Sequence, residues 1–226
     1  MTIILTNDDG IDAPGIAAFK KAVSQKNTVI VAPKVQHSGC GHQVTTHRGI
    51  EVIKRSPEAY CIDGTPADCT RLGIKRLVPE TKLVLSGINA GGNLGTDVYI
   101  SGTVAAVREA AIHGIPGIAI SHWIKRPLVI DWDWATHWAS KVISELFTHS
   151  LAPGSFWNVN LPHLEPTAKD PKIIFCQPSI DPLPADFRVE ENTYYYQGEY
   201  AKRDRTPGTD VDVCFGGNIA VTQISL

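Results

Sequence analysis

Short apolar runs alternate with helical patterns through the first 150 residues, and this alternation limits the fold more than any other feature of the chain. Short apolar runs, typical of strands, occur at 2–6, 28–32, 59–62, 82–85 and 117–121. Helical spacing of apolar residues, or a helix-start signal, marks 14–23, 66–76, 101–113 and 133–147. Strands that alternate with helices predict an α/β protein whose mostly parallel sheet is covered by helices on both faces.

The pattern changes after about residue 150, where short strands follow one another without helices between them. Apolar runs at 156–161, 172–175, 193–197 and 218–224 are separated by polar and proline-rich stretches. We therefore expect a core over 1–150 and a second region over 151–226. In that second region, some strands would complete the core, and a β-hairpin elaboration would reach another subunit.

The overall composition is that of an ordinary globular protein. The 226 residues carry a formal net charge of −2, so no basic field attracts a nucleic-acid polymer, whereas a single nucleotide needs only local complementarity. Five widely spaced cysteines without a C-x-x-C pair argue against a disulfide framework and against a cysteine-ligated zinc ion. The N-terminus lacks the features of a signal peptide, and no run reaches the roughly 18 apolar residues of a membrane span. We expect a cytoplasmic protein that does not enter a membrane.

Two adjacent carboxylates, Asp8 and Asp9, follow the first predicted strand within the motif Asn7-Asp8-Asp9-Gly10. Adjacent carboxylates repel each other, and a cation between them is one use of such a pair. Both can face one ion only if the chain leaves the extended conformation there, which Gly10 permits. Because Asn, Asp and Gly are also ordinary turn residues, the motif alone is equally consistent with a metal site and with a plain turn.

Two glycine-containing segments follow later strands. Ser38 offers a neutral oxygen in the loop after the second strand, and Gly39 lets the backbone approach a ligand, although a solvated loop is the simpler reading of this segment alone. The segment 86–97 contains four glycines and two asparagines at the end of a buried strand, a destabilising composition unless close backbone approach is needed. Within it, Asn89 can give a carbonyl oxygen to a metal or an amide donor to a phosphate.

The motif Ser101-Gly102-Thr103 opens a predicted helix. Free N–H groups and the positive end of the helix dipole make such a position an anion site, and the two hydroxyls add donors. An ordinary N-cap explains the same residues equally well when the helix is taken in isolation.

These four clusters should converge, because ligands of open α/β sheets bind outside the carboxyl ends of the strands. Oxygen-only ligation selects Mg²⁺ or Mn²⁺ over zinc. A divalent cation beside an anion cradle is the arrangement that phosphoryl transfer requires. The oxygen ligands would come from Asp8, Asp9, Ser38 and Asn89.

The ordered set of motifs resembles the signature blocks of the SurE family. The blocks are NDDG at 7–10, APG at 13–15, AP at 32–33 with SG at 38–39, GTPADC at 64–69, SGIN-x-G-x-N-x-G-x-D at 86–97, SGTVAA at 101–106 and GTD at 208–210. They match in order and spacing over nearly the whole chain. The resemblance implies a Rossmann-like three-layer α/β sandwich with an added, subunit-exchanging C-terminal part, and assembly into homodimers or homotetramers.

The same resemblance implies hydrolysis of nucleoside 5'-monophosphates, often also of 3'-monophosphates and of short polyphosphate. One divalent ion per subunit, Mg²⁺ or Mn²⁺, would be required. Carried over by motif, the metal ligands are Asp8, Asp9, Ser38 and Asn89, with the two aspartates also catalytic. The phosphate pocket would be lined by Gly39, Asn93, Ser101, Gly102 and Thr103.

The chain departs from the family pattern at two places. It ends at Leu226, soon after its last predicted strand, whereas family members usually continue into a C-terminal helical arm. Tyr99 lies one place earlier than the aromatic residue that commonly precedes the SGTV motif, and Ile100 takes that place. We expect the second departure to alter packing near the pocket more than the chemistry.

The expected mechanism uses the metal to polarise the phosphate ester and to lower the pKa of a water that attacks phosphorus in line. Asp8 or Asp9 would orient that water, and Ser101 and Thr103 would stabilise charge in the transition state. His37 and His42 flank Ser38, and either could protonate the leaving alkoxide, although exposed loop histidines are the more common case.

Two other classes of function stay open. A nucleotide-sensing module would bind metal and nucleotide without turnover. A metal-dependent hydrolase of another bond, such as an amide deacetylase, would need a zinc site with histidine beside the acidic pair, which NDDG does not contain.

Overall fold

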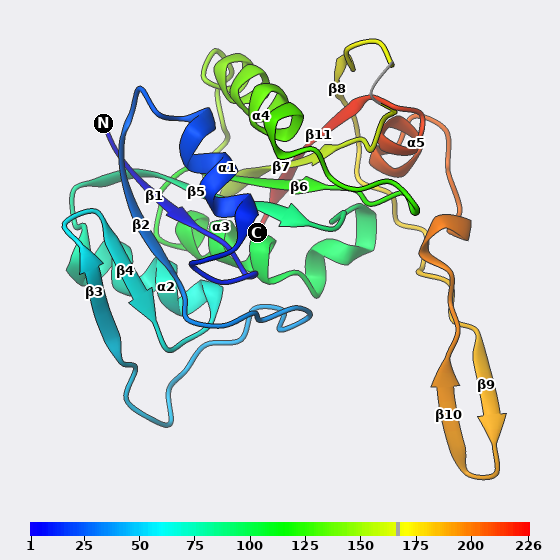
Figure 1. Cartoon of the computed structure of the whole chain (residues 1–226), viewed down its shortest axis with the longest axis horizontal. Helices are drawn as coiled ribbons and strands as arrows, with labels where there is room; N and C mark the ends of the chain where they lie inside the picture. Colours follow the sequence, from blue (N-terminus) through cyan, green and yellow to red (C-terminus); the bar gives the residue numbers. More distant parts are fainter. Residues whose placement is uncertain (166–167) are drawn as a thin grey trace.

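The computed structural model describes residues 1–165 and 168–226 of the chain. Among these residues, nine strands form one sheet in the order β3-β4-β2-β1-β5-β6-β7-β11-β8 (Figure 1). Strands β4, β2, β1, β5, β6 and β7 run parallel to one another. At the two ends of this set, β3 pairs antiparallel with β4, and β11 pairs antiparallel with β7 and parallel with β8. The predicted mostly parallel sheet is therefore confirmed. The strands are β1 Thr2–Thr6, β2 Asn27–Pro33, β3 Val52–Ser56, β4 Ala59–Ile62, β5 Thr81–Ala90, β6 Gly117–His122, β7 Ser155–Leu161, β8 Ile173–Phe175 and β11 Ile219–Ser225.

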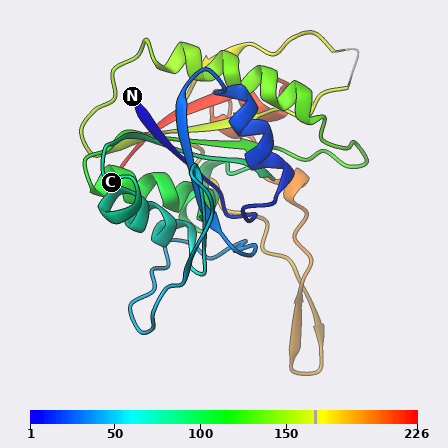
Figure 2. The same ribbon diagram turned by 60° about the vertical axis from the view of Figure 1, so that its left-hand side comes forward.

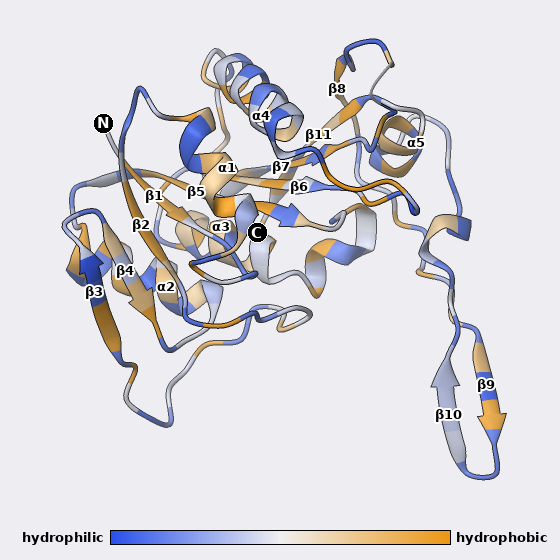
Figure 3. Ribbon diagram, viewed as in Figure 1, coloured by the Kyte–Doolittle hydropathy of each residue, from blue (hydrophilic) through white to orange (hydrophobic). Residues whose placement is uncertain are grey.

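Helices cover both faces of the sheet and complete a three-layer sandwich. Helices α1 (Pro14–Ala22) and α4 (Trp132–Leu146) pack on one face, and α2 (Pro66–Leu72) and α3 (Gly102–Ile112) pack on the other. Successive side chains of a strand point to opposite faces. Ile3 and Leu5 therefore join the core under α1 and α4, whereas Ile4 joins the core under α2 and α3. Figure 3 shows the hydrophobic residues gathered in these inner strands.

The helix-start signals of the sequence act as expected. Thr65 and Asp68 form a reciprocal capping box at the start of α2, with Pro66 at the first helical position. Ser101 caps α3 by accepting a hydrogen bond from the backbone N–H of Val104. The predicted helix 66–76 is interrupted, because α2 ends at Leu72 and one π-helical turn, Gly73–Leu77, follows it.

The region after residue 150 contributes both to the sheet and to a separate hairpin. Strands β7, β8 and β11 extend the main sheet, and the short helix α5 (Asp210–Phe215) packs beside β11. Strands β9 (Phe187–Glu190) and β10 (Thr193–Tyr196) pair only with each other and project away from the sandwich (Figure 2). Every residue of these two strands is exposed. The division at residue 150, and the oligomerising role of this hairpin, stay predictions.

Several elements differ from the sequence-based expectation. Strand β5 does not end at Leu85 but continues to Ala90, because its ladder with β6 resumes after a register shift between Gly87 and Asn89. Strands β3 and β9 and helix α5 were not predicted. Both strands are exposed throughout and so have no buried face, and α5 is only six residues long. No helix within the described residues has the length and apolarity needed to cross a membrane.

Candidate functional site

The turn after β1 separates the two neighbouring carboxylates. Asn7 closes the turn by donating its side-chain amide to the carbonyl of Gly10 at 2.7 Å, and Gly10 has a positive φ of 101°. Asp8 then points toward α3, where the Thr103 hydroxyl donates to its Oδ1 at 2.5 Å. Asp9 points toward the end of β5, where the backbone N–H of Ala90 donates to its Oδ2 at 3.3 Å. The motif is therefore a turn that also presents two carboxylates.

Both carboxylates are electrostatically disfavoured where they lie. Asp8 is 5% exposed, and burial raises its pKa to about 6, with repulsion from Asp9 adding to the shift and the Thr103 hydrogen bond opposing it. Burial also raises the pKa of Asp9, against the hydrogen bonds from Ala90 and Gln36. A cation bound between them would offset both effects.

The loop after β2 brings Ser38 to the acidic pair. The side-chain amide of Gln36 donates to Asp9 Oδ1 at 3.2 Å and to Ser38 Oγ at 2.8 Å. The backbone N–H of His37 donates to the carbonyl of Asp8 at 2.7 Å, which fastens this loop to the end of β1. Gln36 was given no role by the sequence, because its position two residues before Ser38 does not reveal which groups its amide meets.

Asn89 lies near the end of β5, next to the residue that binds Asp9. Its side-chain nitrogen donates to the carbonyl of Gly91 at 2.9 Å. This bond orients the amide and leaves Oδ1 without a hydrogen-bond donor among the described residues, as a cation ligand requires. The structure thus gathers Asp8, Asp9, Ser38 and Asn89 at one edge of the sheet.

The first turn of α3 packs directly against Asp8. A Cβ atom on Gly102 would lie 2.8 Å from Cβ of Asp8 and 2.9 Å from the sulfur of Cys40, so only glycine fits. Thr103 is fully buried, and its hydroxyl is engaged with Asp8. The Gly102 and Thr103 N–H groups, at the positive end of the helix dipole, form a site where an anion can bind beside the carboxylates.

Two residues predicted for the phosphate pocket, Asn93 and Gly39, make no hydrogen bond to the acidic pair or to the first turn of α3 among the described residues. Asn93 is 7% exposed, and its side-chain nitrogen donates to Ser121 at 2.7 Å, while its backbone N–H donates to Asn160 at 2.7 Å. Asn93 therefore braces the loop that follows β5. Gly39 is exposed, with open space where a Cβ atom would be.

The C-terminal region binds the loop after β5 through hydrogen bonds made by residues that the sequence analysis did not single out. Arg203, which is 3% exposed, donates to Asp97 Oδ2 at 2.8 Å, and Tyr200 donates to the same oxygen at 2.5 Å. Asp210, within the GTD block, accepts hydrogen bonds from the backbone N–H groups of Gly95 at 2.7 Å and Ser179 at 2.8 Å. Three of these contacts join residues more than one hundred positions apart, and the contact between Ser179 and Asp210 spans 31, so motif analysis does not reveal them.

Glu109 of α3 holds the far end of the Ser38 loop. Its Oε2 is 2.7 Å from His42 Nε2, while its Oε1 is 3.2 Å from His113 and 3.4 Å from Arg71. Burial opposes the charge of Glu109, but the His42 hydrogen bond and the surrounding positive charges hold its pKa below the ordinary value. His42 is thus engaged with Glu109 rather than free in solvent.

The donors at this edge fit a hard divalent cation. Within the described residues, no three side chains of His, Cys, Asp or Glu gather as a metal site. The candidate metal ligands are instead two carboxylates, Asp8 and Asp9, and two neutral oxygens, from Ser38 and Asn89. The buried carboxylate of Asp8, repelled by the partly buried carboxylate of Asp9, and the unengaged Oδ1 of Asn89 suit Mg²⁺ or Mn²⁺. All five cysteine thiols are free.

The fold and these side chains define an open α/β protein with its candidate ligand site at the carboxyl ends of the strands. The family model for survival protein SurE matches residues 3–179, and the chain belongs to the SurE family. A protein of Nostoc sp. strain PCC 7120 is 61% identical over 224 residues, 99% of each chain. A 5'-nucleotidase SurE of Paramagnetospirillum magneticum is 37% identical over 232 residues, 99% of this chain and 89% of its own. The crystal structure of a SurE protein from Aquifex aeolicus matches with a TM-score of 0.88 and 30% identity, over 100% of this chain and 93% of that one.

Proposed function

We propose that the chain is a divalent-metal-dependent 5'-nucleotidase that hydrolyses nucleoside monophosphates to nucleoside and phosphate. Its place in the SurE family and relatives named 5'-nucleotidase SurE support the nucleotidase class. The observation that carries the proposal is the meeting of four oxygen donors with the N-terminus of α3 at one sheet edge. This arrangement pairs a cation site with an anion site, as phosphoryl transfer requires.

Each residue of the edge has a distinct part in this proposal. Asp8, Asp9, Ser38 and Asn89 hold the ion. When bound, the ion supplies positive charge that offsets charge on the phosphate oxygens and makes a nearby water more acidic. The N–H groups at the start of α3 and the Ser101 hydroxyl bind the remaining phosphate oxygens.

The two aspartates share one further task. A carboxylate oxygen of Asp8 or Asp9 accepts a hydrogen bond from the attacking water and aims it at phosphorus. Thr103 has a further part, because its hydroxyl donates to Asp8 and so fixes the rotamer of that carboxylate, while its backbone N–H belongs to the anion site.

The test is phosphate release from a panel of nucleoside monophosphates by EDTA-treated protein, with and without added Mg²⁺ or Mn²⁺. We expect release only with metal. Binding of nucleotide and metal without release from any substrate would contradict the proposal and indicate a nucleotide-sensing module.

Finer features of the family belong to the same proposal. They are activity on 3'-monophosphates and short polyphosphate, assembly into a homodimer or homotetramer through the β9–β10 hairpin, and a cytoplasmic location. The same release assay with 3'-nucleotides and tripolyphosphate, and light scattering of the purified chain, test the first two.

A further inference from the structure

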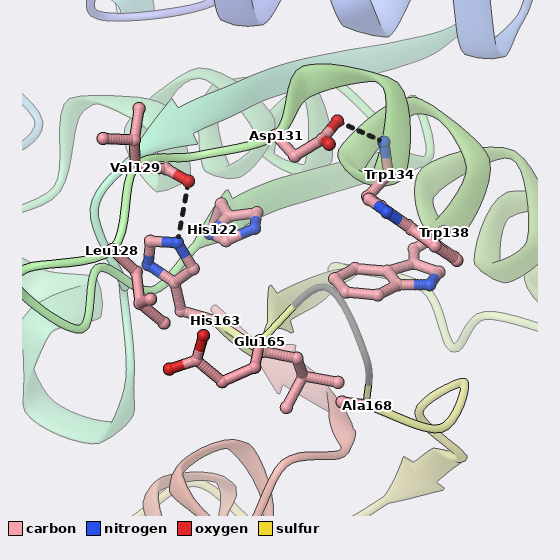
Figure 4. A pocket seen from close by; sticks show the side chains of 10 residues that line it. His122, Leu128, Val129, Asp131, Trp134, Trp138, His163, Glu165 and Ala168 are labelled. Carbon is pink, nitrogen blue, oxygen red and sulfur yellow. Dashed lines mark hydrogen bonds between the residues drawn. The ribbon is translucent and has the colours of Figure 1, made fainter.

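A second polar feature lies on the opposite face of the same sheet edge, in a cavity of about 250 Å³. The cavity lies between the start of α4, the end of β6 and the segment after β7 (Figure 4). Its aromatic lining comes from Trp134, Trp138, His122 and His163. None of these residues has a part in the phosphate chemistry proposed above.

His122 presents one unengaged hydrogen-bond acceptor to this cavity. The side chain is 2% exposed, and its Nδ1 lies 2.7 Å from the carbonyl of Trp123. Because a carbonyl only accepts, Nδ1 carries the proton, and in the neutral ring Nε2 is an acceptor. No donor to Nε2 is found among the described residues.

The neighbouring His163 is fully engaged by contrast. Its Nδ1 accepts from the backbone N–H of Lys125 at 3.0 Å, and its Nε2 donates to the carbonyl of Val129 at 3.2 Å. The two rings meet edge to face with centroids 4.9 Å apart. His163 therefore packs against His122, and Nε2 of His122 is the acceptor offered to a ligand.

The walls of the cavity define the chemical class of that ligand. The Trp134 and Trp138 rings lie with centroids 5.5 Å apart and give aromatic surface. The only formally charged residues among the described lining are Asp131 and Glu165, and it holds no lysine or arginine. An anionic group is disfavoured there, whereas a neutral, flat ring with N–H donors can stack on an indole and donate to His122.

The cavity also lies next to the candidate phosphate site. His122 pairs with Ala90 across the β5–β6 ladder, and its carbonyl accepts from the N–H of Gly91 at 3.0 Å. Ala90 in turn binds Asp9, and Asn89 precedes it. Since neighbouring strands are about 4.8 Å apart, the His122 backbone is one strand spacing from Ala90, the residue that follows the proposed metal ligand Asn89.

We propose that this cavity receives the nucleobase of the substrate, with an N–H group of the base donating to His122 Nε2 and the ring stacking on Trp134. The inference rests on the proposed nucleotidase function and adds a base subsite to it. The exposed phosphate edge and the aromatic cavity would then hold the two ends of one nucleotide.

The test compares adenosine 5'-monophosphate with ribose 5-phosphate, which keeps the phosphate ester and the sugar but lacks the base. Trp134→Ala removes one wall, and Ala168→Trp fills the cavity from its exposed rim. We expect the ratio of kcat/KM for the nucleotide to kcat/KM for ribose 5-phosphate to fall about 10-fold in each variant, as loss of one base–aromatic stack predicts.

Phe147→Ala is the matched control, because Phe147 follows the other end of α4 and is 41% exposed against 40% for Trp134. It should leave the ratio unchanged. Equal loss for both substrates in Trp134→Ala and Ala168→Trp, or no loss in either, would overturn the inference.

Calorimetric titration of adenosine into the EDTA-treated chain separates this inference from the proposed function. If no substrate releases phosphate, the nucleotidase proposal fails. Adenosine binding that Ala168→Trp abolishes would still support the base site. Absence of adenosine binding would exclude a base site.

Discussion

At the carboxyl edge of the sheet, each face holds one buried titratable side chain, Asp8 on one face and His122 on the other. Burial shifts their pKa values in opposite directions. On the α3 face, burial raises the pKa of Asp8 to about 6, and on the α4 face, burial lowers the pKa of His122 to about 4. Each shift disfavours the charged form. The consequences differ because His122 is uncharged in its favoured form, whereas Asp8 has the carboxylate of Asp9 beside it and would be stabilised by a cation. One face therefore suits metal and phosphate, and the other suits an uncharged ring.

The largest expected effect comes from removing the charge on the α3 face. Asp8→Asn should lower kcat by at least about 10³-fold, because the ligand set loses one of its two carboxylates. The same change should stabilise the EDTA-treated chain. Because the folded-state pKa of Asp8 lies above the ordinary value of 3.8, it gives stability that is present below that value and lost as pH rises through about 6.

Phosphate release and thermal melting between pH 4 and pH 8 check both parts. Asp8→Asn should melt at a higher temperature than the unaltered chain above pH 6, with the difference shrinking toward pH 4. Near-normal turnover in Asp8→Asn would remove the metal assignment.

On the α4 face, acid should destabilise the fold through His122. Its folded pKa of about 4 lies below the ordinary value of 6.5, so the stability from the neutral ring is complete above pH 6.5 and is lost as pH falls through about 4. The loss is on the order of 3 kcal/mol. Urea unfolding at pH 7 and pH 4.5 measures it, and His122→Gln should flatten the profile. Parallel pH profiles for the two proteins would show that His122 titrates normally.

Crowding on the α3 face should weaken catalysis without changing any charge. Gly102→Ala places a methyl group 2.8 Å from Cβ of Asp8, and displacement of a catalytic group by a fraction of an ångström to an ångström lowers kcat up to about 10²-fold. Gly49→Ala is the control, because nothing lies within 4 Å of its Cβ position. Equal activity of the two variants would show that the first turn of α3 can shift freely.

The smallest expected effect concerns the tether between α3 and the Ser38 loop. His42→Ala frees the loop from Glu109. We expect kcat/KM to fall roughly 10-fold and the metal concentration needed for half-maximal phosphate release to rise. His113→Ala removes a histidine from the other oxygen of the same Glu109 without touching the loop. Metal titrations of phosphate release should separate the two variants. Matching losses would mean that Glu109 acts only on the stability of α3.

Much of the fold could be read from local patterns. The apolar runs predicted β1 and β4 with their observed ends, and Thr65 and Ser101 predicted the starts of α2 and α3. These signals are local because strand burial and helix capping act between residues close in sequence. β3 was missed because it is an exposed edge strand without a buried face, and its ladder is set by β4.

In the candidate site, too, part of the result follows from local sequence motifs and part from contacts between distant residues. The sequence by itself determined its chemistry, since the motifs carry the oxygen donors and the glycine that α3 needs beside Asp8. Only the tertiary structure decided which groups those donors meet: Gln36 joining Asp9 to Ser38, Thr103 holding Asp8, and His122 facing an aromatic cavity. The physical reason is that side-chain hydrogen bonds and burial depend on neighbours brought together by the sheet, and these neighbours lie far apart along the chain.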